Sequence, residues 1–102
     1  LADEDNYPIY FHCSLGTDRA GELSDILHYL CSVDPNDVDY NYAFSNLAYI
    51  GSSRDYSKPS RTELKKLILN YGDKVDSQST AACLKDKLGL SDETINNIIN
   101  KL

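Results

Sequence analysis

The chain has 102 residues and a mass of 11.4 kDa, which is enough for one small domain with one hydrophobic core. Hydrophobic residues make up 41% of it and charged residues 25%, an ordinary globular composition, and no stretch approaches the roughly 20 apolar residues that a membrane-spanning helix needs. We therefore expect no membrane span. Sixteen acidic against ten basic residues give a net charge of -6, which repels phosphate backbones, so bulk nucleic-acid binding is not expected either.

The start of the chain says little about the compartment. Residues 1–6 are small, acidic and polar, without the basic and apolar regions of a signal peptide. Because the chain begins with Leu1 rather than methionine, we expect it to be a piece of a longer protein. Cytoplasmic and secreted locations both stay open.

Three cysteines occur with irregular spacing: Cys13, Cys31 and Cys83. The odd count argues against a disulfide framework, and the lack of Cys or His pairs at ligand spacing argues against a metal site. No cofactor is expected either. Cys31 continues a helical series of apolar residues and Cys83 lies between Ala82 and Leu84, so both are predicted to be buried. Cys13 fits neither pattern.

Residues 8–12 are predicted to form the one strand of the chain. Ile9, Tyr10 and Phe11 have high β propensity, and the run stops at a turn-like sequence. A lone buried strand leaves both edges without hydrogen-bond partners. Two alternatives follow: the strand pairs with a second molecule or with an N-terminal half outside this chain, or the segment frays and lies on the helices.

Two helices are predicted in the first half of the chain. Apolar residues recur at three- and four-residue steps from Ala20 to Cys31, which is typical of a helix with one buried face. Asp34 then supplies an N-cap with Pro35 at the first helical position, and this second helix is expected to run to about residue 47.

Three more helices are predicted after a loop at residues 48–59. Their boundaries carry a capping box at the start of the third helix, glycine ends for the third and fourth, and a serine N-cap for the fifth. The residues concerned are Ser60 with Glu63, Gly72, Gly89 and Ser91. A polar connector at residues 73–77 precedes the fourth helix. The basic residues of this half are predicted to lie on a solvated helix face: Lys58, Arg61, Lys65 and Lys66.

The segment between the strand and the first helix carries the candidate chemistry. Five residues separate Cys13 from Arg19, and Gly16 between them allows a turn where a Cβ would crowd an anion. A loop this short can curl so that its backbone amides point to one centre, and the dipole of the following helix adds to their effect. Phosphate is the expected ligand of this loop. The candidate phosphate-binding residues are Ser14, Leu15, Gly16, Thr17, Asp18 and Arg19.

Cys13 is the candidate nucleophile of this loop. The converging amides, the helix N-terminus and the Arg19 cation all favour its thiolate over its thiol. Arg19 is expected to bind two oxygens of a phosphoryl group through two N–H groups, a geometry that lysine lacks. His12 is expected either to orient the loop by hydrogen bonding or to be an ordinary histidine at a strand end.

Asp18 is the candidate general acid. Phosphoryl transfer from an ester requires a proton for the leaving oxygen, and no other carboxylate is tied by the sequence to this loop. The same group could then act as a base for the water that hydrolyses a cysteinyl-phosphate. The alternative is that Asp18 only N-caps the first helix. Gly21, three residues on, is expected at a close contact between this helix and the strand.

These residues resemble the signature of the protein tyrosine phosphatase superfamily, a Cys-x5-Arg loop preceded by histidine and followed by glycine two residues after the arginine. With aspartate directly before arginine, the loop is similar to that of the bacterial tyrosine/serine phosphatase branch, HCxxGxDR[ST]G. The resemblance implies a cysteinyl-phosphate mechanism with the loop aspartate as general acid. It also implies phosphotyrosine or phosphoserine proteins, or phosphoinositide headgroups, as substrates.

The resemblance continues along most of the chain. The run at residues 33–46, with Tyr40 as the tyrosine of a DY pair, and the Leu-Gly-x-Ser turn at residues 88–91 are similar to later motifs of the family. Two positions depart from the family pattern. Ala20 replaces a Ser or Thr that helps the thiolate leave the phosphoenzyme, and Thr17 replaces a common lysine at the pocket rim.

The implied fold is mostly α, with one N-terminal strand, the phosphate-binding loop and about five helices, as the C-terminal part of an α/β phosphotyrosine-phosphatase-like fold. Residues 1–47 would supply the strand, the loop and two helices, and residues 48–102 a loop and three helices. An N-terminal half of the catalytic domain, which would complete the sheet, is then an expected partner.

Three readings of function follow from these residues. The first is a cysteine-dependent phosphatase that hydrolyses phosphomonoesters. The second is a pseudophosphatase or phosphate-binding module, which the alanine at position 20 and the acidic surface favour. The third is a helical subdomain that is folded but inactive when isolated, and it is compatible with the first.

Overall fold

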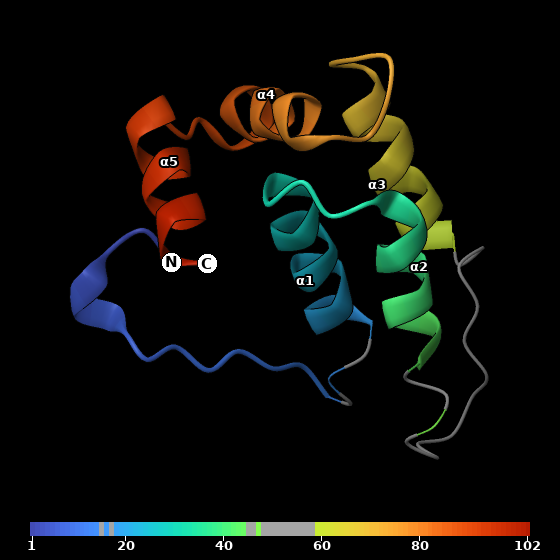
Figure 1. The fold of residues 1–102 in the computed structure, drawn as a ribbon, viewed down its shortest axis with the longest axis horizontal. Coiled ribbons are helices and arrows are strands. Elements are labelled where there is room, and N and C mark those ends of the chain that lie inside the picture. Colours follow the sequence, from blue (N-terminus) through green and yellow to red (C-terminus); the bar gives the residue numbers. More distant parts are fainter. Residues whose placement is uncertain (15, 17, 45–46, 48–58) are drawn as a thin grey trace.

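The protein is described by a computed structural model that covers residues 1–14, 16, 18–44, 47 and 59–102. A short 3-10 helix η1 (Glu4–Asn6) precedes five α-helices, and Figure 1 shows their arrangement. Their bounds are α1 Arg19–Leu30, α2 Pro35–Ala43, α3 Pro59–Leu69, α4 Ser77–Leu88 and α5 Asp92–Lys101. The described part is therefore mostly helical, as predicted, and is consistent with a C-terminal helical part of a phosphatase-like fold.

The predicted strand at residues 8–12 is not formed. These residues run as an irregular segment from η1 to the start of α1 (Figure 1), and the described part of the chain contains no strand. Tyr10 is 85% exposed and Phe11 is also exposed. A strand needs a hydrogen-bonding partner along its edge, and no described segment supplies one here. In this chain the segment is frayed, with Tyr10 and Phe11 exposed and not packed on the helices. Pairing with a second molecule or an N-terminal half stays a prediction.

The first two helices begin where the sequence predicts. The α1 helix starts at Arg19, one residue before the first predicted position, and the Asp34 carboxylate caps α2 by accepting from Asn36 N–H over 2.8 Å. The α2 helix ends at Ala43 instead of about residue 47. Phe44 and Leu47, the two described residues of the predicted extension, are exposed and do not continue the buried face of α2.

The α3 helix differs from its predicted boundaries at both ends. It begins at Pro59, so Ser60 lies inside the helix and the proposed capping box with Glu63 is wrong. It ends at Leu69, and Gly72 is neither adjacent to it nor at a positive φ. A Cβ on Gly72 would lie 2.9 Å from the Ser79 Cβ, so close packing, not helix termination, requires glycine here.

The last two helices have clear caps. The Asp76 carboxylate and the Ser79 side chain form a capping box for α4, which starts at Ser77, inside the stretch predicted as a connector. Gly89, at φ +69°, ends α4, and Ser91 accepts from Thr94 N–H to cap α5, both as predicted. None of the described helices is long and apolar enough to cross a membrane.

The core consists of two clusters on either side of α1. One joins Tyr29 to Val38 of α2, Ile68 of α3 and Cys83 of α4, and the other joins Leu30 to the α5 residues Ile95 and Ile98. Figure 1 shows α1 between α2 and α5, with α4 running across one end of it. Tyr29 and Leu30, adjacent residues of α1, belong to one cluster each, so α1 is the central helix of the fold. The loop with Cys13 leads directly into this helix.

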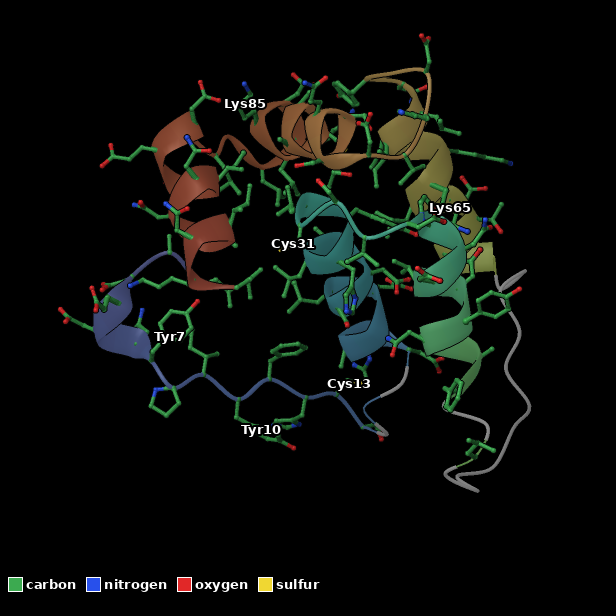
Figure 2. The ribbon with its side chains drawn as sticks, viewed as in Figure 1. Tyr7, Tyr10, Cys13, Cys31, Lys65 and Lys85 are labelled. Carbon is green, nitrogen blue, oxygen red and sulfur yellow. The ribbon has the colours of Figure 1, made fainter. Side chains whose placement is uncertain are left out.

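The two cysteines predicted to be buried have different surroundings. Cys83 is buried, as predicted, and burial raises the pKa of its thiol. Cys31 is exposed, so that prediction is wrong. The α1 helix ends at Leu30, and the next residue leaves the helical path before the apolar stripe returns to the core. Figure 2 shows Cys31 and Cys13 at opposite ends of α1.

Candidate active site

The loop before α1 brings Cys13 to the N-terminus of this helix. Ala20 N–H donates a hydrogen bond to the Cys13 sulfur over 3.5 Å, although seven residues separate the two. Gly16 has φ +77°, a left-handed conformation that glycine adopts without strain. Cys13 and the first turn of α1 are therefore in contact, so the two ends of the segment lie close together. Leu15 and Thr17 lie outside the described residues.

Cys13 lies at the N-terminal end of α1. Cys13 is half-buried, and its sulfur contacts a backbone N–H in the first turn of α1, where the helix dipole is positive. Arg19 is the first residue of α1 and is exposed, as are Ser14 and Gly16. The thiol, the helix N-terminus and an exposed guanidinium are thus contributed by one short segment.

His12 contacts the loop backbone. Its Nδ1 lies 3.2 Å from the Cys13 carbonyl oxygen, and its ring stacks on Tyr10 with centroids 5.5 Å apart. Of the two predicted roles for His12, orientation of the loop has this contact in its favour. The predicted strand end is absent, because no strand forms.

Asp18 occupies the N-cap position of α1 but does not act as a cap. Its side chain makes no capping hydrogen bond. Instead, its Oδ1 accepts a hydrogen bond from the Tyr42 hydroxyl over 2.8 Å. The alternative prediction, that Asp18 only caps the helix, is therefore wrong. The side chain is hydrogen-bonded to a residue of the next helix.

Tyr42 is a site residue that sequence reasoning missed. It is 4% exposed and lies one turn after the buried Val38 on α2, a spacing that indicates burial but not a partner 24 residues away. A Cβ on Gly21 would lie 3.6 Å from the Tyr42 ring, so Gly21 makes its close approach to α2 and not to a strand. Tyr40, which the resemblance assigned to a family motif, is exposed instead.

Arg61 lies behind Tyr42 and is buried, which overturns its predicted place on a solvated face. The side chain is 1% exposed, and its guanidinium carbon lies 4.4 Å from the centre of the Tyr42 ring. Its Nε donates to Asp25 over 2.7 Å, and its Nη2 lies 3.0 Å from an Asp39 oxygen. Lys65 also donates to Asp39. Two carboxylates and an aromatic face compensate for the buried charge, and the sequence does not place them together.

Burial and charge have opposite effects on this cluster. Burial raises the pKa of the Asp25 carboxyl, and the hydrogen bond and charge of Arg61 oppose that rise. Burial also acts against the charge of Arg61, but its hydrogen bond to Asp25 and the two nearby carboxylates raise its pKa overall. The neighbouring Tyr29 has a pKa raised to about 12, chiefly by burial. Arg61 therefore stays protonated, and the cluster has a fixed positive centre.

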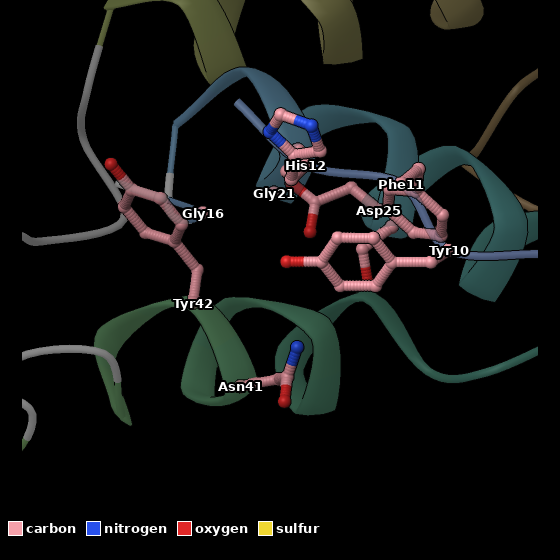
Figure 3. A pocket seen from close by; sticks show the side chains of 10 residues that line it. Tyr10, Phe11, His12, Gly16, Gly21, Asp25, Asn41 and Tyr42 are labelled. Atoms are coloured by element: carbon pink, nitrogen blue, oxygen red, sulfur yellow. The ribbon is translucent and has the colours of Figure 1, made fainter. Parts of the chain in front are cut away.

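A pocket of about 390 Å³ adjoins the loop, within the size range of small-ligand sites. Figure 3 shows Gly21 and Asp25 of α1 facing Asn41 and Tyr42 of α2. Its lining residues are Tyr10, Phe11, His12, Gly16, Ala20, Gly21, Ser24, Asp25, Asn41 and Tyr42. Among the described residues, no group of three potential metal ligands occurs here or elsewhere.

The sequence profile of the tyrosine phosphatase family matches residues 1–102. No protein of curated function and no solved structure matches the chain. The match spans every residue of the chain, including the loop that brings a cysteine to the start of a helix and the four helices that follow. The chain therefore belongs to the tyrosine phosphatase family.

Proposed function

We propose that the loop at residues 12–19 is the active site of a cysteine-dependent phosphatase of bacterial tyrosine/serine type. The observation that carries the proposal is the hydrogen bond from Ala20 N–H to the Cys13 sulfur over 3.5 Å. It joins the candidate nucleophile to the positive end of α1, which is also where a phosphoryl dianion binds best. Family membership favours the same chemistry.

The reaction proceeds in two displacements. The Cys13 thiolate attacks phosphorus, the bond from phosphorus to the leaving oxygen breaks, and Asp18 gives that oxygen a proton. Water then attacks the cysteinyl-phosphate, gives a proton to Asp18, and the sulfur leaves as thiolate with release of inorganic phosphate. Arg19 and the amides of residues 14–19 stabilise the charge on the equatorial oxygens. His12 orients the loop.

The proposed substrates are phosphomonoesters of proteins, on tyrosine or serine, or of phosphoinositide headgroups. The pocket beside the loop has aromatic walls from Tyr10, Phe11 and Tyr42, which suit a substrate with an apolar or aromatic body. Residues 1–102 would form the C-terminal part of the catalytic domain. An N-terminal half would then pair with residues 8–12 and complete a sheet.

Turnover of a small aryl phosphate tests the proposal. The full-length protein and its Cys13→Ser variant are compared, and we expect at least about a 1,000-fold loss in the variant, because a hydroxyl lacks the nucleophilicity of a thiolate at neutral pH. A Cys31→Ser variant is the matched control, since that thiol is exposed at the far end of α1. Equal rates for the wild type and Cys13→Ser would remove the mechanism.

A second candidate function is phosphate capture without turnover. Ala20 has no hydroxyl to assist departure of the thiolate, and its backbone N–H is the donor to the sulfur at 3.5 Å. A cysteinyl-phosphate that accumulates and decays slowly would favour capture. Intact-mass measurement after mixing with an aryl phosphate distinguishes the two, because a phosphatase with rapid turnover shows little adduct. Ala20→Ser is then expected to speed the decay.

A further inference from the structure

The hydroxyl of Tyr42 and the carboxylate of Asp18 join α2 to the active-site loop. They lie 2.8 Å apart, and the hydroxyl donates to Oδ1. From this geometry we propose that Tyr42 is a positioning residue that orients Asp18 for proton transfer to the leaving group. The inference rests on the proposed phosphatase function and adds to it a residue outside the loop.

Tyr42 is itself held from two sides. The guanidinium carbon of Arg61 lies 4.4 Å from the centre of the Tyr42 ring. On another side, Gly21 of α1 approaches the ring so closely that an added Cβ would lie 3.6 Å from a ring carbon. The ring is 4% exposed. A side chain packed in this way has little rotational freedom, so its hydroxyl presents a fixed donor to Asp18.

Arg61 is fixed in turn by ionic contacts. It donates to Asp25 of α1 and pairs with Asp39 of α2, while Lys65 shares Asp39. One buried arginine of α3 therefore forms ionic contacts with both α1 and α2, and its guanidinium packs on the Tyr42 ring. The chain of contacts runs from Arg61 through the Tyr42 ring to the Asp18 carboxylate.

A fixed carboxylate matters because general acid catalysis depends on geometry. The proton must lie within hydrogen-bond reach of the leaving oxygen, and a misplaced acid loses most of its effect. The Asp18 side chain makes no capping hydrogen bond to α1, and the Tyr42 hydroxyl is a donor to it from the next helix. Tyr42 also lines the pocket beside the loop, so its ring borders the space where a substrate is expected to bind.

Tyr42→Phe separates the hydroxyl from the ring. Phenylalanine keeps the contacts with Gly21 and Arg61 and removes the donor to Asp18. We expect kcat/KM to fall about tenfold for an alkyl phosphate, whose basic leaving oxygen needs a proton, and to stay within about twofold for 2,4-dinitrophenyl phosphate, whose leaving oxygen does not. Tyr40→Phe is the matched control, because Tyr40 is 63% exposed on the same helix and should change neither rate.

A double variant tests whether the effect passes through Asp18. In an Asp18→Ala background, adding Tyr42→Phe should cause no further loss, because the group that Tyr42 positions is gone. All rates are measured below the lowest Tm of the set, so that a destabilised variant is compared in its folded state. A loss that is equal for both leaving groups, or that persists in the Asp18→Ala background, would overturn the positioning role.

The same series separates this inference from the function on which it rests. Cys13→Ser is included with both substrates. Turnover that does not depend on Cys13 removes the proposed function, and the role of Tyr42 with it. Suppose instead that turnover depends on Cys13 but that Tyr42→Phe slows both substrates to the same extent, or slows neither. The proposed phosphatase function then stands, and only the role of Tyr42 is disproved.

Discussion

Arg61 donates a hydrogen bond from Nε to the Asp25 carboxylate over 2.7 Å, and the two side chains are 1% and 2% exposed. The pair joins α3 to α1 across 36 residues of sequence. The same guanidinium lies over the ring of Tyr42, whose hydroxyl donates to Asp18 of the candidate loop, so one side chain serves both the buried ion pair and this contact. This sharing makes the stability of the fold and the geometry of the site depend on each other.

Replacement of Arg61 should therefore destabilise the protein strongly. Arg61→Met leaves the Asp25 carboxylate buried without its cation, and removing one partner of a buried pair typically costs about 3–5 kcal/mol. The free energy of unfolding is measured by urea denaturation followed by circular dichroism. We expect the midpoint to fall while the secondary structure of the remaining folded fraction is retained.

Lys66→Met provides the matched control for Arg61. Lys66 lies on the same helix with a side chain 68% exposed, and its nitrogen is 3.7 Å from Glu63. An exposed pair of this kind contributes less than about 1 kcal/mol. Equal losses for the two variants would contradict the buried position of Arg61.

The cap of α4 should give stability a dependence on acid. Backbone and hydroxyl hydrogen bonds from Ser79 hold the pKa of the Asp76 carboxyl below its ordinary value of 3.8. A carboxyl whose pKa is lower in the folded state contributes stability above its unfolded pKa, and that contribution is lost as pH falls through the folded value. Asp76→Asn keeps a capping oxygen without a charge, so its Tm should be lower than the wild type's near neutral pH, and the gap should shrink in acid.

Thermal unfolding at a series of pH values checks this expectation. Asp73→Asn is the control, because Asp73 is exposed and lies three residues before the cap. Its Tm should follow the wild-type curve. If the Tm of Asp76→Asn falls below pH 4 as steeply as the Tm of the wild type, the Asp76 cap does not cause the acid dependence of stability.

The three thiols should react with iodoacetamide in a defined order. Near pH 8, exposed Cys31 should react at least about tenfold faster than Cys83, which is 4% exposed and whose pKa is raised by burial. Near pH 6, Cys13 should react faster than Cys31, because the N-terminus of α1 favours its thiolate. Peptide mass spectrometry of the alkylated protein gives the three rates.

Inorganic phosphate and urea serve as controls for the thiols. Phosphate should slow alkylation of Cys13 alone, because it competes for the same loop. Urea should make all three rates alike. Rapid labelling of Cys83 in the folded protein would contradict the packing between α1 and α4.

The sequence was most informative where structure is decided by neighbouring residues. Asp34 with Pro35, Gly89 and Ser91 mark helix ends in the structure as predicted, because each acts on backbone groups within a few residues of itself. Ser60 was misread because a proline next to it is an equally local and stronger signal for the start of α3.

Contacts between distant segments could not be predicted in the same way. Arg61 belongs to a run of basic residues that looks solvated, and only the meeting of α1, α2 and α3 places two carboxylates and an aromatic ring around it. The segment at residues 8–12 has strand-forming residues, but a strand also requires a partner, which its own composition cannot supply.

The amino-acid sequence alone determined the loop with its cysteine, aspartate and arginine and the helix that follows, because turn and helix signals act over a few residues. The tertiary structure alone decided that Asp18 is held by Tyr42 and that Tyr42 is held by Arg61. These partners are 24 and 19 residues apart, and their contact depends on how the helices pack, which is set by burial of apolar surface over the whole chain.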